Sequence, residues 1–552
     1  MLSDTRSTLA LPSRARLILY LILAVAGLLR LARLDLMAFE MDEGVACVFA
    51  VRFTHYGLPP LAGIKTSLQF HNSPLFLYVI SPALLVTTDP RFAAMLFALL
   101  GTVAVYVVYR TGREFFSPAV GLLAAAMMAL SPAAVEYSRR LWGHSLIQVL
   151  CPIAFYLLLR WVVAGRAKAV FWLALIIAAA QQFHFSGALL WCQVVLAYLL
   201  FRPRTDWAGF VAGLALGLLG YIPFFILQAD TGFLDLRIIG EAIWRGAGQP
   251  RTFSIKPLAN WFFAATDLGH NNFLQNDFGL FLAGLPFYRL TRAVAGLAWV
   301  AGLTACAVWA LRGGTGILPV KEHRQDAYAT RRRAVEPLLL LTWSVVPLVV
   351  FLLLRVPVVA PYFLVVYPVP FLAIAWLVVE VRQRLGRTGF QPVSSLRRGL
   401  QSVAVLLFAG WAAHQMVFNI ALRTHLDREG GGKGSYASFA SQQAAMRFIA
   451  NHAPRRTVLV TEEYLDPSRG IDFRYWYLLW TFDHDMERFF PVNREKAEYW
   501  YVIRNTNYRI RPDFDEFLAA YPSCDFGFLR VYVIPRPGPW PRFGSLQPAA
   551  ST

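Results

Sequence analysis

The feature that most limits how this chain can fold is a succession of long apolar runs separated by short basic loops. A helix needs about 20 apolar residues to cross a bilayer, and by that rule about eleven candidate spans occur along the chain. Their approximate cores are residues 17–34, 91–109, 118–132, 146–163, 169–183, 187–201, 208–228, 293–311, 337–354, 362–380 and 401–419. With 57% hydrophobic and 15% charged residues, the chain also lies outside the range of soluble domains. We therefore expect a polytopic α-helical membrane protein.

The basic residues set the direction in which the spans cross. They gather in every second loop, at Arg14 and Arg16, Arg110 and Arg113, Arg160 to Lys168, Arg202 and Arg204, Lys321 to Arg333, and Arg382 to Arg398. The positive-inside rule makes these loops cytoplasmic. The net charge of +19 therefore sets orientation and does not predict a nucleic-acid partner. Loops 35–90, 133–145 and 229–292, the segment near Arg355 and the C-terminal region then face the opposite side, the periplasm of a bacterial inner membrane or its equivalent.

The composition changes near the end of the last span. We expect residues 1–425 to form the transmembrane domain, with large outer loops at 35–90 and 229–292, and residues 435–540 to form a small soluble α/β domain. A glycine-rich joint at residues 430–434 connects the two. The soluble part has helix-like periodicity at 442–451 and 512–521 and strand-like sequence at 457–461, 499–505 and 526–534. Residues 75–87 are apolar but short and flanked by prolines, which suits an interfacial or re-entrant helix.

Two adjacent carboxylates, Asp42 and Glu43, follow the first span directly. An acid at a bilayer surface is unfavourable unless it is used, so we expect these two to serve chemistry. The alternative is that Asp42 caps a short helix and Glu43 favours its dipole. Carboxylates, histidines and arginines share the outer face, which indicates an anionic, hydroxyl-bearing substrate, because the arginine fork matches phosphate.

Several short motifs then occur in a characteristic order. Met41-Asp42-Glu43-Gly44 follows the first span, His71-Asn72-Ser73-Pro74-Leu75 opens an apolar helix, and Ser131-Pro132 precedes Tyr137-Ser138-Arg139. In this the chain resembles the GT-C membrane glycosyltransferases related to protein O-mannosyltransferases and to the aminoarabinose transferase of lipid A. The resemblance covers residues 17 to about 230; beyond them, Pro361-Tyr362-Phe363-Leu364 is similar to the family's Arg-Tyr-Leu-Leu-Pro span.

The resemblance implies a mechanism and a set of site residues. Asp42, with Glu43 beside it, corresponds to the family's catalytic acid. It would take a proton from a lipid, protein or glycan acceptor while a sugar leaves a polyprenyl-phosphate donor with inversion. Arg139, Arg140 and Arg355 are the candidates for holding the phosphate. The further substrate-binding candidates are His71, Asn72, His144 and Tyr362. No cofactor is expected, and the relatives nearest in motif do not depend on a metal.

Each of these residues also has a structural alternative. His71 and Asn72 could cap the helix that Pro74 begins, and Arg139 and Arg140 could be interfacial arginines that snorkel. His144 could be a structural hydrogen-bonding residue and Tyr362 a member of the aromatic belt.

Three departures from the family pattern are visible. A charged pair before Pro-Pro is replaced by His71-Asn72-Ser73-Pro74, an acid of the second outer loop is replaced at Gly143-His144-Ser145, and Pro361 stands before Tyr362 in place of arginine.

The main alternative function is a transporter or flippase of lipid-linked glycans, which predicts charged or broken helices at the bilayer midplane. A non-enzymatic membrane scaffold that presents the C-terminal domain is a further alternative. The five cysteines show no metal-type spacing, and three of them, Cys151, Cys192 and Cys306, lie in apolar spans, so neither a disulfide framework nor a zinc site is predicted.

Overall fold

The computed structural model describes residues 12–66, 69–245, 255–265, 278–312, 324–354, 358–385, 394–431, 437–454, 457–461, 472–482, 498–506 and 512–535. The chain divides into two compact units. The first comprises Met1–Leu34, Phe49–His270 and Ala283–Ile420, and the second comprises Asp35–Val48, Asn271–Leu282 and Ala421–Thr552. The segment that carries Asp42 and Glu43 therefore belongs to the same unit as the C-terminal domain. The domain boundary near residue 425 stays a prediction.

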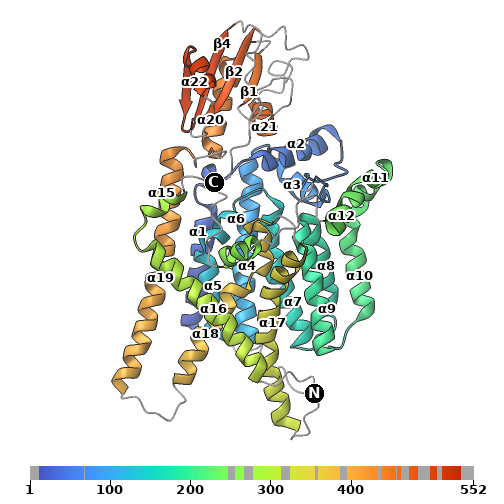
Figure 1. The fold of residues 1–552 in the computed structure, drawn as a ribbon, viewed down its shortest axis with the longest axis vertical. Helices are drawn as coiled ribbons and strands as arrows, with labels where there is room; N and C mark the ends of the chain where they lie inside the picture. Colours follow the sequence, from blue (N-terminus) through green and yellow to red (C-terminus); the bar gives the residue numbers. More distant parts are fainter. Residues whose placement is uncertain are drawn as a thin grey trace. The chain divides into compact units, whose positions relative to one another are not determined.

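The first unit is helical (Figure 1). Its helices are α1 (Ser13–Leu31), α3 (Leu75–Val86), α4 (Pro90–Phe115), α5 (Pro118–Leu130), α6 (Pro132–Tyr137), α7 (Gly143–Val162), α8 (Ala169–Phe183), α9 (Leu189–Phe201), α10 (Trp207–Leu218), α11 (Ile222–Asp230), α12 (Leu234–Arg245), α13 (Lys256–Ala265), α16 (Tyr288–Arg312), α17 (Arg324–Leu354) and α18 (Val369–Leu385). The 3-10 turns are η1 (Leu34–Leu36), η2 (Phe185–Ala188), η3 (Leu219–Tyr221) and η4 (Ala360–Val366). Helices α2 (Met41–Tyr56), α15 (Phe278–Ala283) and α19 (Ser394–Glu429) contain residues of both units.

Small residues let the apolar helices approach closely, as is usual between membrane helices. Helix α4 packs against α1, α5 and α7, helix α8 packs against α7 and α10, and α18 packs against α5, α16 and α17. At the α4–α5 crossing a Cβ on Gly112 would lie 2.5 Å from the Cα of Gly121. At the α8–α10 crossing a Cβ on Gly213 would lie 2.1 Å from the carbonyl oxygen of Phe171. Both positions therefore require glycine.

The predicted helical membrane architecture is confirmed, whereas the count of about eleven spans stays a prediction. Among the described residues six helices are long and apolar enough to cross a membrane, and a seventh span results if η4 and α18 are taken together. Four shorter apolar helices, of 10 to 17 residues, include α3 and α5. Helix α3, with 12 residues, is about 18 Å long at 1.5 Å per residue. This length agrees with the predicted interfacial or re-entrant helix at residues 75–87.

The break between η4 and α18 is a bend of 53°. It releases backbone carbonyls that need partners, because water is scarce within a bilayer. The indole Nε1 of Trp343 on α17 supplies them, donating to the carbonyl oxygens of Val365 at 2.9 Å and Tyr367 at 3.3 Å. The broken segment, which carries Tyr362, is thus held by a fully buried tryptophan.

The second unit contains a four-stranded sheet with the order β1-β2-β4-β3. Strand β1 (Thr457–Thr461) is parallel to β2 (Tyr499–Asn505), while β4 (Leu529–Pro535) is antiparallel to β2 and to β3 (Ser523–Phe526). The helices of this unit are α20 (Phe439–His452), α21 (Phe473–Phe482) and α22 (Pro512–Ala519). The sheet buries a core made of Val458, Val460, Trp500, Val502, Phe514, Leu518, Tyr532 and Ile534. The predicted small α/β domain is confirmed.

One predicted strand, 526–534, is wrong in its extent. The structure has a hairpin there, in which Phe526 of β3 pairs with Leu529 of β4 across two residues. Gly527 allows this turn because its φ of +61° is a backbone conformation that glycine adopts without strain.

Candidate functional site

The two adjacent acids lie in the first turn of α2 and have different environments. Glu43 is fully buried, and its Oε2 accepts a hydrogen bond of 3.1 Å from the backbone N–H of Glu40. Since α2 begins at Met41, this is the return bond of a capping box, which satisfies an amide at the helix start. Asp42 stays half-buried. The capping role that the sequence offered for Asp42 therefore belongs to Glu43.

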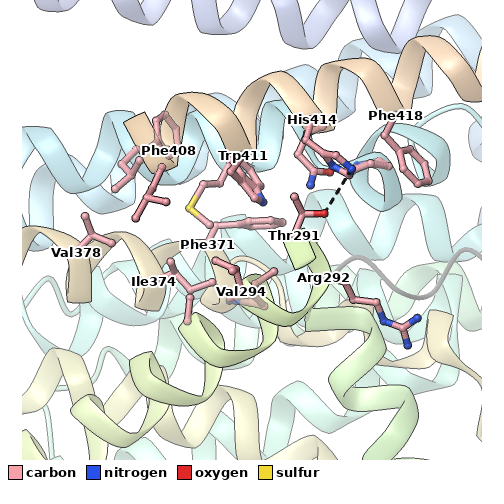
Figure 2. A pocket seen from close by; sticks show the side chains of 18 of the residues that line it. Thr291, Arg292, Val294, Phe371, Ile374, Val378, Phe408, Trp411, His414 and Phe418 are labelled. Atoms are coloured by element: carbon pink, nitrogen blue, oxygen red, sulfur yellow. Dashed lines mark hydrogen bonds between the residues drawn. The ribbon is translucent and has the colours of Figure 1, made fainter. Parts of the chain in front are cut away.

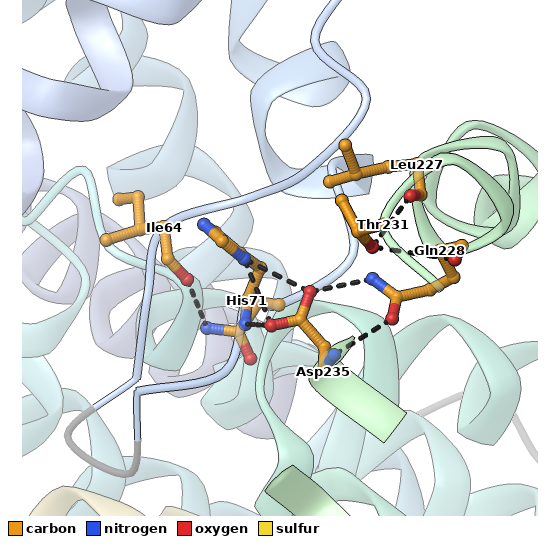
Figure 3. Close-up of polar contacts among 7 residues, drawn as sticks. Ile64, His71, Leu227, Gln228, Thr231 and Asp235 are labelled. Carbon is orange, nitrogen blue, oxygen red and sulfur yellow. Dashed lines mark hydrogen bonds and ion pairs between the residues drawn. The ribbon is translucent and has the colours of Figure 1, made fainter. Parts of the chain in front are cut away.

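His71 is held by an acid that the sequence analysis did not select (Figure 3). Its Nδ1 lies 3.1 Å from both carboxylate oxygens of Asp235, and its backbone N–H donates to Oδ1 at 3.1 Å. Asp235 itself accepts from Nε2 of Gln228 at 2.7 Å and donates its backbone N–H to Oε1 of the same side chain at 3.0 Å. The Asp235 carboxylate is 5% exposed, whereas the His71 side chain is 29% exposed. The buried Asp235 carboxylate thus holds the imidazole through Nδ1, and part of the His71 side chain stays exposed.

Asn72 holds the neighbouring backbone. Its Nδ2 and its backbone N–H both donate to the carbonyl oxygen of Ile64, at 3.2 and 3.1 Å, and its own carbonyl accepts from Gly63 at 2.8 Å. These bonds shape the hairpin on which His71 lies. The structure therefore gives Asn72 a backbone-holding position, and its predicted contact with substrate stays a prediction.

The two predicted phosphate-binding arginines diverge. The guanidinium of Arg139 is 1% exposed and donates to the carbonyl oxygens of Leu29, Arg30, Ala32 and Arg33 at the end of α1. These are carbonyls that a helix C-terminus leaves without an intrahelical partner.

The guanidinium of Arg140 lies over the ring of Trp142, 4.6 Å from its centroid. Of the two neighbours, Arg139 secures the end of α1, while a phosphate-binding role for Arg140, which is 3% exposed, stays a prediction.

A buried group of rings surrounds His144. The imidazole of His144 lies with its centroid 3.8 Å from that of His184 and 5.5 Å from the ring of Tyr362, to which it is nearly parallel. Trp142 is 4.0 Å away. Both ring nitrogens of His144 are buried, and neither has a hydrogen-bond partner among the residues that the structure describes. A buried polar atom left in this way costs about 1–3 kcal/mol, so the position favours a ligand that can exchange hydrogen bonds with it.

His184, which no sequence motif indicates, also belongs to this group of rings. Its Nδ1 accepts from the backbone N–H of Ser186 at 3.2 Å and caps η2. Because Nδ1 is an acceptor, the neutral ring carries its proton on Nε2. Burial lowers the pKa of His184 to about 3, so the ring is neutral at physiological pH.

Phe185 connects the His71 hairpin to the His144 rings. The centroid of its ring lies 6.0 Å from that of Phe70, the neighbour of His71, and 5.2 Å from that of Tyr362. His184 lies 4.3 Å from the same ring. Ring contacts thus link Trp142, which lies under Arg140, with His144, His184 and Tyr362, and Phe70 connects this group to the hairpin that carries His71.

Two predictions are not tested by this geometry. Arg355 lies outside the described residues. Within the described ranges no three His, Cys, Asp or Glu side chains gather as metal ligands. Independence of a metal therefore stays a prediction.

An apolar pocket of about 260 Å³ lies among α5, α16, α18 and α19 in the first unit (Figure 2). Phe371, Trp411 and Met127 contribute to its walls. Its few polar side chains include Arg292 and the pair Thr291 and His414, whose Oγ1 and Nε2 are 3.5 Å apart. The pocket therefore suits an apolar chain with a polar end.

Comparison with known proteins agrees with the motifs. Residues 71–227 match the family model of dolichyl-phosphate-mannose-protein mannosyltransferases. The fold is similar to that of ArnT from Cupriavidus metallidurans in the apo state, with 16% identity, a TM-score of 0.56 and coverage of 94% of this chain and 98% of ArnT. ArnT bound to undecaprenyl phosphate matches with 12% identity, a TM-score of 0.50 and coverage of 95% and 98%. No curated protein sequence matches the chain. The relationship that the motifs predicted is confirmed.

Proposed function

We propose that this integral membrane protein, a relative of the mannosyltransferases and of ArnT within the GT-C glycosyltransferases, transfers a sugar from a polyprenyl-phosphate donor to an acceptor hydroxyl or amine. The reaction takes place on the non-cytoplasmic side of a bacterial inner membrane. The observation that carries the proposal is the match of residues 71–227 to the mannosyltransferase family. The matched segment includes His71, Arg140 and His144.

The reaction is a single displacement at the anomeric carbon. The acceptor heteroatom attacks this carbon, its proton passes to the carboxylate of Asp42, and the bond to the phosphate oxygen breaks. Polyprenyl phosphate leaves with the bonding electrons, and the configuration inverts. Because phosphate is already a good leaving group, one general base suffices, in contrast to the two carboxyl groups of a glycosidase.

The His71–His144 region is suited to the donor's head group. Arg140 supplies a permanent positive charge for the phosphate. His144 supplies buried ring nitrogens that have no hydrogen-bond partner in the described part of the chain, and the rings of Trp142 and Tyr362 offer flat surfaces for a sugar. His184 is neutral at physiological pH, so it adds no positive charge to that of Arg140.

The apolar pocket supports a lipid-linked substrate class. Its walls are built from helices that also expose apolar side chains, among them Val294 and Leu407 at 48% and 68% exposure. A polyprenyl or acyl chain enters such a pocket from an equally apolar bilayer, so it is held by close packing against the walls and not by transfer from water. Arg292 provides a cation at the pocket wall.

Mass spectrometry of membranes with and without the gene tests the proposal. We expect cells that lack the gene to accumulate one polyprenyl-phosphate sugar and to lose one glycosylated product, which together identify donor and acceptor. Unchanged lipid-linked sugars and unchanged glycans would contradict the proposal.

The bend between η4 and α18 is the observation that favours the transporter alternative, because broken helices are typical of transporters. An assay in detergent separates the two functions. A glycosyltransferase forms its product without a sealed compartment, whereas a flippase has no measurable activity there.

A further inference from the structure

Residues 37–39, which lie just before Asp42, are bound by the start of α20 in the second unit. The backbone N–H of Phe439 donates to the carbonyl oxygen of Met37 at 3.2 Å. Nε2 of Gln442 donates to the carbonyl oxygen of Phe39 and to that of Ala437, both at 2.8 Å. Gln442 is 1% exposed. A buried amide therefore ties residue 39, three positions before Asp42, to a helix some 400 residues later in the chain.

Aromatic packing fixes the same stretch. The ring of Phe39 is fully buried and lies 5.5 Å from Phe439, edge to face, and 6.1 Å from Tyr477 of α21. Such pairs add about 0.5–1.5 kcal/mol beyond the area they bury. Tyr477 also hydrogen-bonds the thiol of Cys47, which is fully buried. The segment is thus held before and after Asp42.

The start of α21 contacts α2 immediately beside the acid. Asp472 caps α21 through Oδ1, which accepts from the backbone N–H of Arg474 at 3.0 Å, and its Oδ2 accepts from Nη2 of Arg474 at 2.6 Å. Both side chains are at most 6% exposed. A Cβ on Gly44 would lie 2.6 Å from the backbone nitrogen of Arg474. Gly44, two residues after Asp42, therefore packs directly on a backbone that the buried ion pair makes rigid.

We infer that α20 and α21 position the general base: Gln442, Tyr477 and the Asp472–Arg474 pair hold the first turn of α2 so that Asp42 is aimed at the acceptor. The inference rests on the proposed function, since it assigns Asp42 the role of base. The C-terminal domain is then a working part of the transferase. Its residues act through the backbone of residues 37–47, so they are positioning residues and not catalytic ones.

Gly44→Ala is the sharpest test. Alanine favours a helix over glycine by about 1 kcal/mol, so the substitution alone should strengthen α2. Here the added methyl group must displace the α2 backbone from Arg474. We expect kcat to fall roughly 10- to 100-fold, as small displacements of reacting groups do, with the KM for the donor little changed. Gly410→Ala is the matched control, because Gly410 is also helical and a Cβ there meets nothing within 4 Å.

Cys47 gives a second readout that needs no catalysis. Burial raises the pKa of its thiol, and the neighbouring Glu43 carboxylate adds to the effect, so the folded segment resists maleimide. Cys192 and Cys524 are the exposed cysteines and are replaced by serine for this assay. We expect Gly44→Ala and Gln442→Met to make Cys47 reactive while Gly410→Ala does not.

Two results would overturn the inference: full kcat in both Gly44→Ala and Gln442→Met, or unchanged protection of Cys47 in both. The proposed function fails separately, when the wild-type protein transfers no sugar from any polyprenyl-phosphate donor. In that case the protection of Cys47 still decides whether α20 and α21 hold the segment.

Discussion

The two adjacent acids of α2 should respond to substitution in opposite ways. Asp42→Asn keeps the size of a half-buried side chain and removes its basicity, so the fold should persist while proton transfer is lost. General-base catalysis contributes roughly 10²–10⁴-fold, and we expect kcat to fall by this factor. At 1.36 kcal/mol for each factor of ten, the barrier rises by about 3–5 kcal/mol.

Glu43 should instead govern stability. Glu43→Gln retains an oxygen that can accept from the Glu40 N–H, so both kcat and the melting temperature should change little. Glu43→Leu removes the acceptor and leaves a buried amide without its partner. The loss of the cap costs about 0.5–2 kcal/mol. We expect this variant to melt earlier than the wild type and to keep most of its kcat when it is assayed at low temperature.

The assay measures sugar transfer by purified protein in nanodiscs with saturating polyprenyl-phosphate donor, and thermal unfolding is followed on the same preparations. Wild-type kcat in Asp42→Asn would refute the assignment of the base. A large loss of kcat in Glu43→Gln, with unchanged melting, would move the role to the buried neighbour.

The other site residues give three further predictions. Asp235→Asn weakens the hold on the His71 ring and should raise the donor KM several-fold, whereas Asp230→Asn, at an exposed end of α11, should not; equal KM values in the two variants would contradict a role for His71. Arg139→Gln should lower the melting temperature and Arg140→Gln the donor affinity; the reverse pattern in thermal and binding assays would mean that the two arginines exchange roles. Burial depresses the pKa of His184 to about 3 from 6.5 in the folded protein, so between these pH values only the unfolded chain binds the proton. The contribution of the buried neutral ring to the free energy of unfolding is therefore complete above pH 6.5. It declines by up to about 1.4 kcal/mol per pH unit on acidification towards pH 3. His184→Asn retains a capping oxygen and should flatten this pH dependence in denaturation experiments.

The fold was predictable where a local pattern has a single physical solution. Long apolar runs with alternating basic loops leave few options in a bilayer, and β1 and β2 occupy the residues that alternation and β-branched content predicted. The hairpin at Gly527 was missed because hydrophobicity continues through Phe526 and Phe528. The signal was the glycine itself, which permits a turn that the apolar residues around it conceal.

The site was less predictable because its members come together only through tertiary contacts. Nothing in the sequence near Asp235 distinguishes it from other acids of the long outer loop. Asp235 becomes a candidate only through its hydrogen bonds with Gln228 and with His71, which lies 164 residues earlier in the chain. His184 lies at the end of an apolar helix, which by itself indicates a structural role, and it does cap η2. The same ring also contacts His144 and Tyr362, so the structural role does not remove it from the site.

Adjacent like residues illustrate why motifs alone leave roles open. In Asp42-Glu43 and in Arg139-Arg140 the sequence offers two equivalent groups, and in each pair one of them satisfies a helix terminus. Glu43 accepts from an amide at the start of α2, and Arg139 donates to carbonyls at the end of α1. Neighbouring side chains on a helix or turn point in different directions, so the group that serves the terminus commits the other to a different environment. In each pair one member is thereby assigned to a helix terminus, and the substrate role that we propose for the other, Asp42 or Arg140, is the one that Asp42→Asn and Arg140→Gln test.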